Sequence, residues 1–166
     1  MNLKITSLVE KNLEDAHKIY NYYITNSYAN FEEKKISFVN FKRNYKNIIQ
    51  NNLPYLTAII NDKVVGIAYL NKFREKSGYR FAFENTIYVH HDYLKQGIGL
   101  ELLTKLISFS KKNKNIKKII AVIGSIDSKG SIRIHEKLGF KKSGLLKKIG
   151  FKKRKWIDSI IMQKDL

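Results

Sequence analysis

The first third of the chain changes between strand-like and helix-like hydrophobic periods. Residues 3–6 alternate apolar and polar side chains, which predicts a short half-buried strand. Apolar positions then recur at helical spacing over 13–26, behind Asn12 as a candidate N-cap, and again over 38–49. Pro54 marks the end of this second segment. The pattern predicts a strand followed by two helices.

The middle of the chain reads as β-structure. The runs 55–60 and 64–73 flank the turn Asn61-Asp62-Lys63, and Asn and Asp tolerate the dihedral angles of tight hairpin turns. A polar loop at 74–78 leads to a third long run, 81–90, which is rich in aromatic and β-branched residues.

The last third mixes both periods. It predicts a helix from Gly97 to about Asn113, a buried strand 119–123, a helix 131–138 with Gly139 just past its end, and strands around 140–149 and 156–162. The order β, α, α, β, β, β, α, β, α, β, β predicts an α/β fold with one sheet and helices on both faces. No repeat or linker marks a boundary, so we expect one domain over residues 1–166.

Composition changes this picture in three ways. The chain has 32 basic and 14 acidic residues, a net charge of +18, which makes polyanions candidate partners. Because 27 of the 32 cations are lysine, as in proteins with AT-rich coding, we expect a solvated basic surface and not a nucleic-acid face. The absence of cysteine excludes disulfides, thiolate zinc sites and a cysteine nucleophile. No signal-like or membrane-spanning run occurs, which predicts a cytoplasmic protein without a membrane partner.

The strongest local signal for chemistry is the turn Leu94-Lys95-Gln96-Gly97-Ile98-Gly99, between a predicted strand and a predicted helix. Glycines let the backbone approach a ligand, and the free N–H groups of a helix start attract a pyrophosphate. Leu102 replaces the third glycine of a dinucleotide fingerprint, and no Gly-Lys-Ser/Thr ending indicates a P-loop. Taken alone, Gly-x-Gly fits a flexible turn equally well.

In this setting, Gln96-Gly97-Ile98-Gly99 resembles the Gln/Arg-x-x-Gly-x-Gly/Ala motif of the GNAT superfamily of acetyl-CoA-dependent N-acetyltransferases. More narrowly, nearly the whole chain is similar to the phosphinothricin N-acetyltransferase family. The matching stretches are Ile19-Tyr20-Asn21, Phe73-Arg74, Ser77-Gly78-Tyr79-Arg80, Glu84, Ile87-Tyr88-Val89-His90, Ser131-Ile132, His135-Glu136-Lys137-Leu138-Gly139-Phe140, Gly150, Lys152, Trp156-Ile157-Asp158 and Met162-Gln163. The chain departs from the family pattern at Ala82, Leu94, Ser125 and Ser128.

The resemblance implies a GNAT fold, with a single mixed, largely antiparallel sheet. It also implies that the strand ending near His90 diverges from its neighbour and leaves a V-shaped cleft for acetyl-CoA, with no metal. The cofactor-binding residues that it implies are Ile87, Tyr88 and Val89 for the pantetheine, the backbone of Lys95, Gln96, Gly97, Ile98, Gly99 and Leu100 for the pyrophosphate, and Ser128 beside the cofactor.

Acetyl transfer to an amine calls for a base, an oxyanion donor and a proton for the departing thiolate. The resemblance implies Glu84 as the base, directly or through a water, and the Val89 backbone N–H as the oxyanion donor. It implies His135 as the group that protonates the thiolate or hydrogen-bonds the sulfur. Without the resemblance, an exposed strand carboxylate and a structural histidine would be the simpler interpretations.

Arg74, Lys76 and Arg80 surround a Gly-Tyr turn just before the strand of Glu84. Arginine binds carboxylates in a bidentate manner, so this rim suits the α-carboxylate of an amino acid. Tyr79, Phe31 and Tyr28 are candidates for the wall around the acceptor side chain, although aromatic residues are equally often core.

The sequence His90-His91-Asp92 is excluded as a metal site, because adjacent strand residues face opposite ways.

We therefore expect an enzyme that acetylates the α-amine of a small amino acid or analogue of the phosphinothricin, methionine sulfoximine or methionine sulfone type. Two alternatives stay open: acetylation of a peptide or polyamine, and a GNAT-shaped module that binds nucleic acid. The second would use Lys141, Lys142, Lys147, Lys148, Lys152, Lys153, Arg154 and Lys155. A homodimer is expected from the resemblance.

Overall fold

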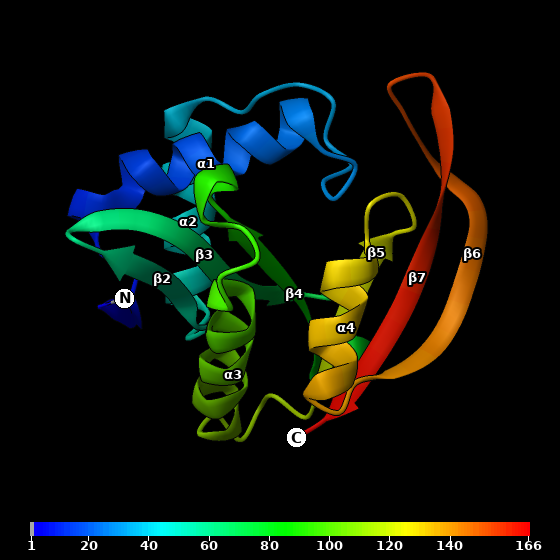
Figure 1. Ribbon diagram of the computed structural model, residues 1–166. Helices are drawn as coiled ribbons and strands as arrows, with labels where there is room; N and C mark the ends of the chain where they lie inside the picture. The colour runs from blue at the N-terminus through cyan, green and yellow to red at the C-terminus, as the bar shows by residue number, and fades with distance from the viewer. Residues whose placement is uncertain (1) are drawn as a thin grey trace.

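The computed structural model describes residues 2–166 (Figure 1). Its strands are β1 (Leu3–Ser7), β2 (Tyr55–Ile60), β3 (Lys63–Lys72), β4 (Ala82–Val89), β5 (Lys118–Gly124), β6 (Lys141–Lys152) and β7 (Lys155–Asp165). Its α-helices are α1 (Leu13–Asn26), α2 (Phe38–Gln50), α3 (Ile98–Lys111) and α4 (Lys129–Lys137). Three short 3-10 turns, η1 (Glu10–Asn12), η2 (Ser77–Tyr79) and η3 (His91–Tyr93), lie between these elements. The order of the strands and α-helices is the one that the sequence predicts.

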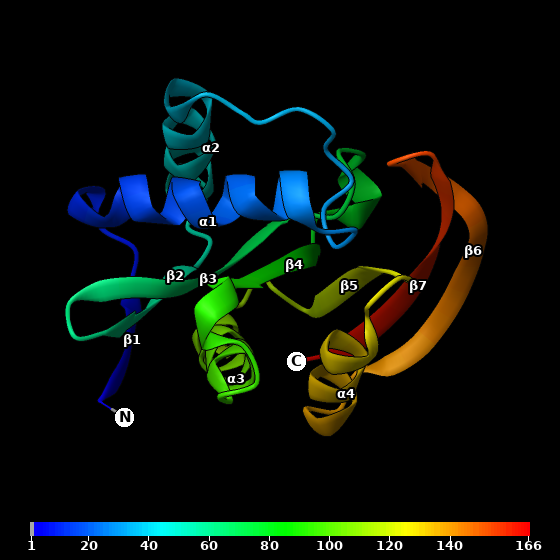
Figure 2. The same cartoon turned by 45° about the horizontal axis from the view of Figure 1, so that its top comes forward.

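The seven strands form one sheet in the order β1-β2-β3-β4-β5-β7-β6. Every neighbouring pair is antiparallel except β4 and β5, which run parallel. Helices α1 and α2 lie on one face of the sheet and α3 and α4 on the other (Figure 2). The prediction of a mixed, largely antiparallel sheet with helices on both faces is confirmed.

Local sequence explains most element boundaries, with one correction. The Ser37 hydroxyl accepts a hydrogen bond from the Asn40 amide and caps α2 as expected of an N-cap serine. Asn12 occupies the predicted N-cap position of α1, but its side chain makes no capping bond, because residues 10–12 already form the η1 turn. The backbone N–H of Asn12 donates to the Val9 carbonyl, at 3.0 Å, within that turn.

The C-terminal hairpin is longer than the hydrophobic pattern predicts. Strands β6 and β7 continue past the expected ends at 149 and 156 until only Lys153 and Arg154 separate them. Both turn residues have positive φ, 48° and 60°, as a two-residue hairpin turn requires. Near the turn the apolar Ile149, Phe151 and Trp156 are exposed while Lys152 is buried, so burial there does not follow the hydrophobic pattern and the pattern does not mark the strand ends.

The sheet opens between β4 and β5. Their parallel pairing extends over only three residue pairs and ends at Glu84↔Ile120. On its other side β4 stays paired to β3 as far as Val89. The two strands therefore diverge beyond Glu84, which confirms the predicted V-shaped opening.

No helix described within residues 2–166 is long and apolar enough to cross a membrane.

Candidate active site

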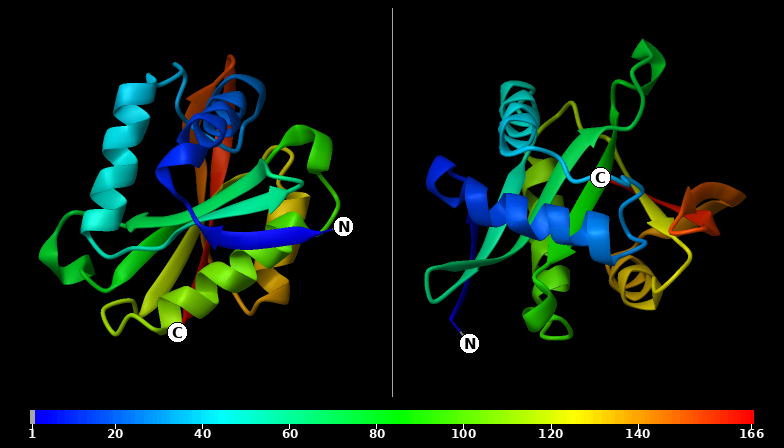
Figure 3. Two further views of the ribbon diagram at one scale, coloured as in Figure 1. Left: turned by 90° about the vertical axis from the view of Figure 1, so that its left-hand side faces the viewer. Right: turned by 90° about the horizontal axis from the view of Figure 1, so that it is seen from above.

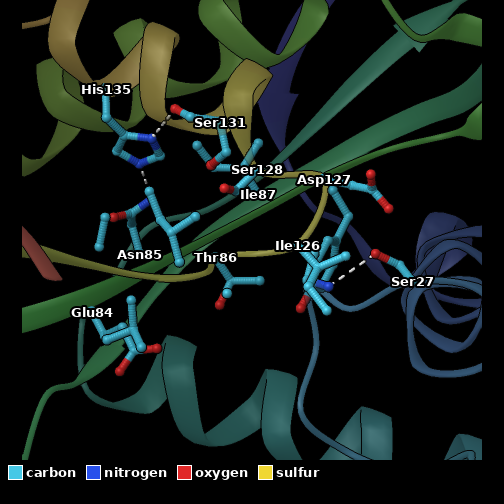
Figure 4. Close-up of a pocket in the computed structure, with 16 residues that line it drawn as sticks. Ser27, Glu84, Asn85, Thr86, Ile87, Ile126, Asp127, Ser128, Ser131 and His135 are labelled. Atoms are coloured by element: carbon cyan, nitrogen blue, oxygen red, sulfur yellow. Dashed lines mark hydrogen bonds between the residues drawn. The ribbon is translucent and has the colours of Figure 1, made fainter. Parts of the chain in front are cut away.

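A cleft of about 130 Å³ occupies the opening between β4 and β5 (Figure 4). Its walls are residues 84–88 of β4, residues 121–124 of β5, and the start of α4 with the loop before it. Ser27 and Ala29, from the loop after α1, reach the same cleft. Of the predicted site residues, it brings together Glu84, Ile87, Tyr88, Ser128 and His135.

Glu84 stands where the two strands separate, as the last residue of β4 that pairs with β5. Burial raises the pKa of its carboxyl above the usual value, and the positive charge of Arg74 offsets part of that rise. A carboxylate with a raised pKa is a better proton acceptor near neutral pH than an exposed one. Its position and pKa both suit the predicted base.

His135 lies on the opposite face of the sheet from Glu84, because it pairs with the next residue of β4. Its Nε2 is 3.0 Å from Nδ2 of Asn85, and its Nδ1 is 2.7 Å from the carbonyl oxygen of Ser131 (Figure 4). Since a carbonyl only accepts, Nδ1 carries the proton and Nε2 accepts from the Asn85 amide. Burial lowers the pKa of the ring, which keeps it neutral.

Asn85 was not among the residues expected at the site. It is 8% exposed, and its Oδ1 has no hydrogen-bond partner among residues 2–166 although it is buried at the cleft wall. The sequence only indicates that Asn85 faces away from Glu84. Its pairing with a histidine 50 residues later depends on the tertiary fold.

Of the two remaining predicted residues near the cofactor, Ser128 lines the cleft and Val89 does not. Ser128 is 8% exposed, occupies the N-cap position of α4 and donates its hydroxyl to the Ser125 carbonyl at 3.2 Å. Val89 ends β4, just beyond the residues that line the cleft, and its carbonyl accepts a 2.7 Å hydrogen bond from the Tyr23 hydroxyl.

The segment from Lys95 to Leu100 leads into α3 and does not itself line the cleft. Gly97 is the N-cap with φ of 82°, and the first helical amide bond runs from Glu101 to the Gly97 carbonyl. The N–H groups of Ile98, Gly99 and Leu100 therefore precede the hydrogen-bonded part of the helix and face its end. A Cβ built on Gly99 would lie 3.6 Å from Ile134 of α4 and 3.7 Å from Val89, so this entry adjoins the cleft.

A Cβ built on Gly97 meets no atom within 4 Å. The backbone there faces open space, which fits a helix N-terminus that receives an anion. The oxygens of a phosphate group can accept hydrogen bonds from these N–H groups.

The loop of residues 27–33 is fixed by the β6–β7 hairpin. The ring of Phe31 lies 3.0 Å from a Cβ built on Gly150. Lys152 is 2% exposed, and its ammonium donates to the Asn30 carbonyl. Lys152 therefore does not belong to the basic surface proposed for nucleic acid, which is a correction to that alternative.

The predicted carboxylate-binding residues line a different cavity. Arg74, Lys76 and Arg80 surround it at the ends of β3 and β4, while Glu84 lines the cleft. Arg80 lies over the Phe81 ring at 4.4 Å, and Tyr79 is 46% exposed. In both views of Figure 3 this loop lies away from the tip of the hairpin. Of the three cations, only Arg74 affects the pKa of Glu84.

The argument from alternation against a metal at His90, His91 and Asp92 is wrong, because residues 91–93 form η3 and do not continue the strand. One ligand atom from each of the three residues lies within 4.8 Å of the others. The rings of His90 and His91 stack at 4.3 Å, and His91 stacks on Tyr22 at 4.3 Å. The absence of a metal stays a prediction.

A family model described as acetyltransferase (GNAT) domain matches residues 5–161, a range that includes the divergent strands and the glycine-capped helix. The chain belongs to the GNAT acetyltransferases. Phosphinothricin N-acetyltransferase of Alcaligenes faecalis is 33% identical over 148 residues, which cover 89% of this chain and 75% of that protein. These findings confirm the resemblance seen in the sequence.

Two further acetyltransferases are similar to the chain. L-methionine sulfoximine/L-methionine sulfone acetyltransferase of Salmonella typhimurium is 28% identical over 152 residues, which cover 90% of this chain and 86% of that protein. The crystal structure of a phosphinothricin acetyltransferase from Sinorhizobium meliloti in complex with acetyl-CoA matches with a TM-score of 0.94 and 33% identity, over 100% of this chain and 89% of that one. The protein is an N-acetyltransferase with acetyl-CoA as its donor.

The residues of this GNAT protein fit that donor. The α3 N-terminus and the open space at Gly97 suit the pyrophosphate, and beyond Glu84 the edge of β4 that faces β5 is free of strand pairing along the cleft. An extended pantetheine, with its amide groups, is the part of acetyl-CoA that such a strand edge can bind.

Proposed function

We propose that this enzyme acetylates the α-amine of a small amino acid or amino-acid analogue, of the phosphinothricin, methionine sulfoximine or methionine sulfone type. The observation that carries the proposal is the partly buried carboxylate of Glu84 at the divergence of β4 and β5, with its pKa raised by burial and the Arg74 charge within electrostatic reach. The named activities of the relatives support the same class of acceptor.

Glu84 takes the proton from the acceptor's ammonium, directly or through a water, so that a neutral amine reaches the thioester. When bound, acetyl-CoA would supply the acetyl group: the amine nitrogen bonds to the carbonyl carbon and loses a second proton to water, the C–S bond breaks, and CoA leaves as a thiolate. The Val89 N–H is our candidate for the donor that stabilises the oxyanion, and residues 95–100 hold the pyrophosphate. Arg74 and Arg80 bind the acceptor's carboxylate in this scheme.

His135 has a positioning role in this proposal. Its only proton is on Nδ1, which faces Ser131, and its lowered pKa opposes a second proton on Nε2. The neutral ring therefore holds the Asn85 amide at the cleft wall, and solvent protonates the thiolate. This role replaces the predicted function of His135 as an acid.

We further propose that the chain works as one domain in the cytoplasm and forms a homodimer. The hairpin of β6 and β7 supports the dimer, since it exposes a group of large apolar side chains: Leu145, Leu146, Ile149, Phe151 and Trp156. The rings of Phe151 and Trp156 lie together, 5.0 Å apart, and exposed apolar side chains that lie together are typical of interaction surfaces.

The test compares free amino acids with their carboxamides as acceptors, using wild type, Arg74→Ala and Arg80→Ala. We expect each variant to raise KM for free amino acids about tenfold or more, the effect of losing one charge-assisted pair. The carboxamides should show no such loss. Equal losses on both substrates would remove the arginines from carboxylate binding, and turnover of peptides or polyamines alone would overturn the proposed acceptor.

A further inference from the structure

A third cavity, of about 250 Å³, lies between α2 and the face of the sheet that α1 and α2 cover. Its walls are asparagine, tyrosine and apolar side chains, and none of its described lining residues is ionisable near neutral pH. The chain has a net charge of +18, so a cavity whose lining carries no charge differs from the overall composition.

This α2 cavity begins next to the candidate base. Asn71 lines it and is the cross-strand partner of Glu84. Tyr69, two residues earlier on β3, also lines it. Burial raises the pKa of Tyr69, with smaller contributions from Tyr20 and from the charge of Glu84, so its hydroxyl lies within electrostatic reach of that carboxylate.

A residue that lines the α2 cavity carries an unpaired donor. Tyr55 on β2 is 3% exposed, and its hydroxyl has no hydrogen-bond partner among residues 2–166. Its ring packs against Tyr69 at 4.5 Å and Tyr45 at 5.7 Å. Leaving a buried hydroxyl unpaired costs about 1–3 kcal/mol. Burial raises the pKa of Tyr55 well above its usual value, so the hydroxyl keeps its proton and remains a donor.

We propose that the α2 cavity binds the side chain of the acceptor, and that it selects a neutral side chain with hydrogen-bond-accepting oxygens, such as a sulfone. This inference rests on the proposed function. An amino acid with its α-amine at Glu84 would direct its side chain over β3 toward β2. Neighbouring strands lie about 5 Å apart, so a methionine-sized side chain covers about one strand spacing, and the Tyr55 side chain, which packs against Tyr69 of β3, covers the rest. Tyr55 then donates to the side-chain oxygen. A polyamine finds no carboxylate in this cavity to pair with its charge.

The test uses two acceptors of similar shape, methionine sulfone and methionine, which differ in the two oxygens. Tyr55→Phe removes only the hydroxyl. The matched control is Tyr45→Phe, because Tyr45 lines the same cavity but already donates its hydroxyl to the Leu8 carbonyl at 3.1 Å.

For Tyr55→Phe we expect KM for methionine sulfone to rise about three- to tenfold, the effect of one hydrogen bond to a neutral group. KM for methionine and the affinity for acetyl-CoA should stay unchanged. The Tm should be equal to that of wild type or higher, because an unpaired buried hydroxyl is lost. Tyr45→Phe should leave the preference for the sulfone intact.

Equal changes for both acceptors, or none, would overturn the cavity assignment and leave the proposed function standing. The same holds if Tyr45→Phe removes the preference as strongly as Tyr55→Phe. If wild type acetylates no free amino acid, the proposed function fails, and this inference fails with it.

Discussion

Gly97 allows a test of the pyrophosphate site that separates folding from binding. Its φ is 82°, and a Cβ built on it meets no atom within 4 Å. The folding cost of Gly97→Ala is therefore backbone strain alone. Left-handed φ costs a non-glycine residue about 1–2 kcal/mol, which lowers the Tm by about 2–8 °C in a protein of this size.

Gly139 is the matched control, because its φ is also 82°. A Cβ built on it lies 3.1 Å from Nζ of Lys164, the mobile end of a long side chain, and otherwise meets nothing within 4 Å. Gly139→Ala should thus lose about the same Tm as Gly97→Ala. Gly139 ends α4 and is not among the residues that line the cleft.

Binding should distinguish the two variants. The added methyl group at Gly97 would occupy the space in front of the first amides of α3 and should cost at least one charge-assisted hydrogen bond, about 1.5–3 kcal/mol. We expect isothermal calorimetry to show acetyl-CoA binding weakened about tenfold or more for Gly97→Ala, and unchanged for Gly139→Ala. Wild-type affinity in Gly97→Ala, or equal losses in both variants, would refute the assignment of the pyrophosphate to this helix start.

Three further changes test the cleft. Glu84→Gln should lower kcat by about 10²–10⁴, with less effect at high pH. It should also raise the Tm at neutral pH. The raised pKa of the Glu84 carboxyl means that the folded protein loses stability as the pH rises through that pKa, and glutamine does not ionise. The lowered pKa of the folded His135 ring means that the unfolded chain binds the proton more tightly, so wild type should lose stability on acidification below the usual histidine pKa of about 6.5. His135→Gln should reduce this loss. Thermal melts of wild type and both variants across pH 5–8 would test the two pH trends. Lys152→Met should destabilise the fold by about 1–3 kcal/mol in urea unfolding and raise KM for the acceptor, whereas unchanged acceptor kinetics would disconnect the 27–33 loop from the site.

The sequence predicts the elements that local patterns encode. Amphipathic periods locate both early helices, and the residue types of the turn 61–63 locate the first hairpin, where Asn61 and Asp62 have φ of 47° and 61°. The divergence of β4 from β5 has no local signal. It could be predicted only because the chain resembles a known family.

Pairings between distant residues account for what the sequence does not reveal. Asn85 and His135 meet across 50 residues, and neither type indicates the other. In the sequence Lys152 is one lysine of a basic run, but in the structure it is buried and donates to the Asn30 carbonyl. The Tyr55 hydroxyl looks like ordinary core until the cavity beside it is known.

The sidedness of the sheet has a kinetic consequence. Consecutive residues of β4 direct Glu84 toward the face of α1 and α2 and Asn85 toward α4, so the opening at β4 and β5 connects two separate approaches. An acceptor and a donor that arrive from opposite faces do not exclude one another, and the chain has no cysteine to carry an acyl group between two half-reactions. We therefore expect both substrates to occupy the enzyme together, and double-reciprocal plots at several fixed acceptor concentrations to intersect instead of running parallel.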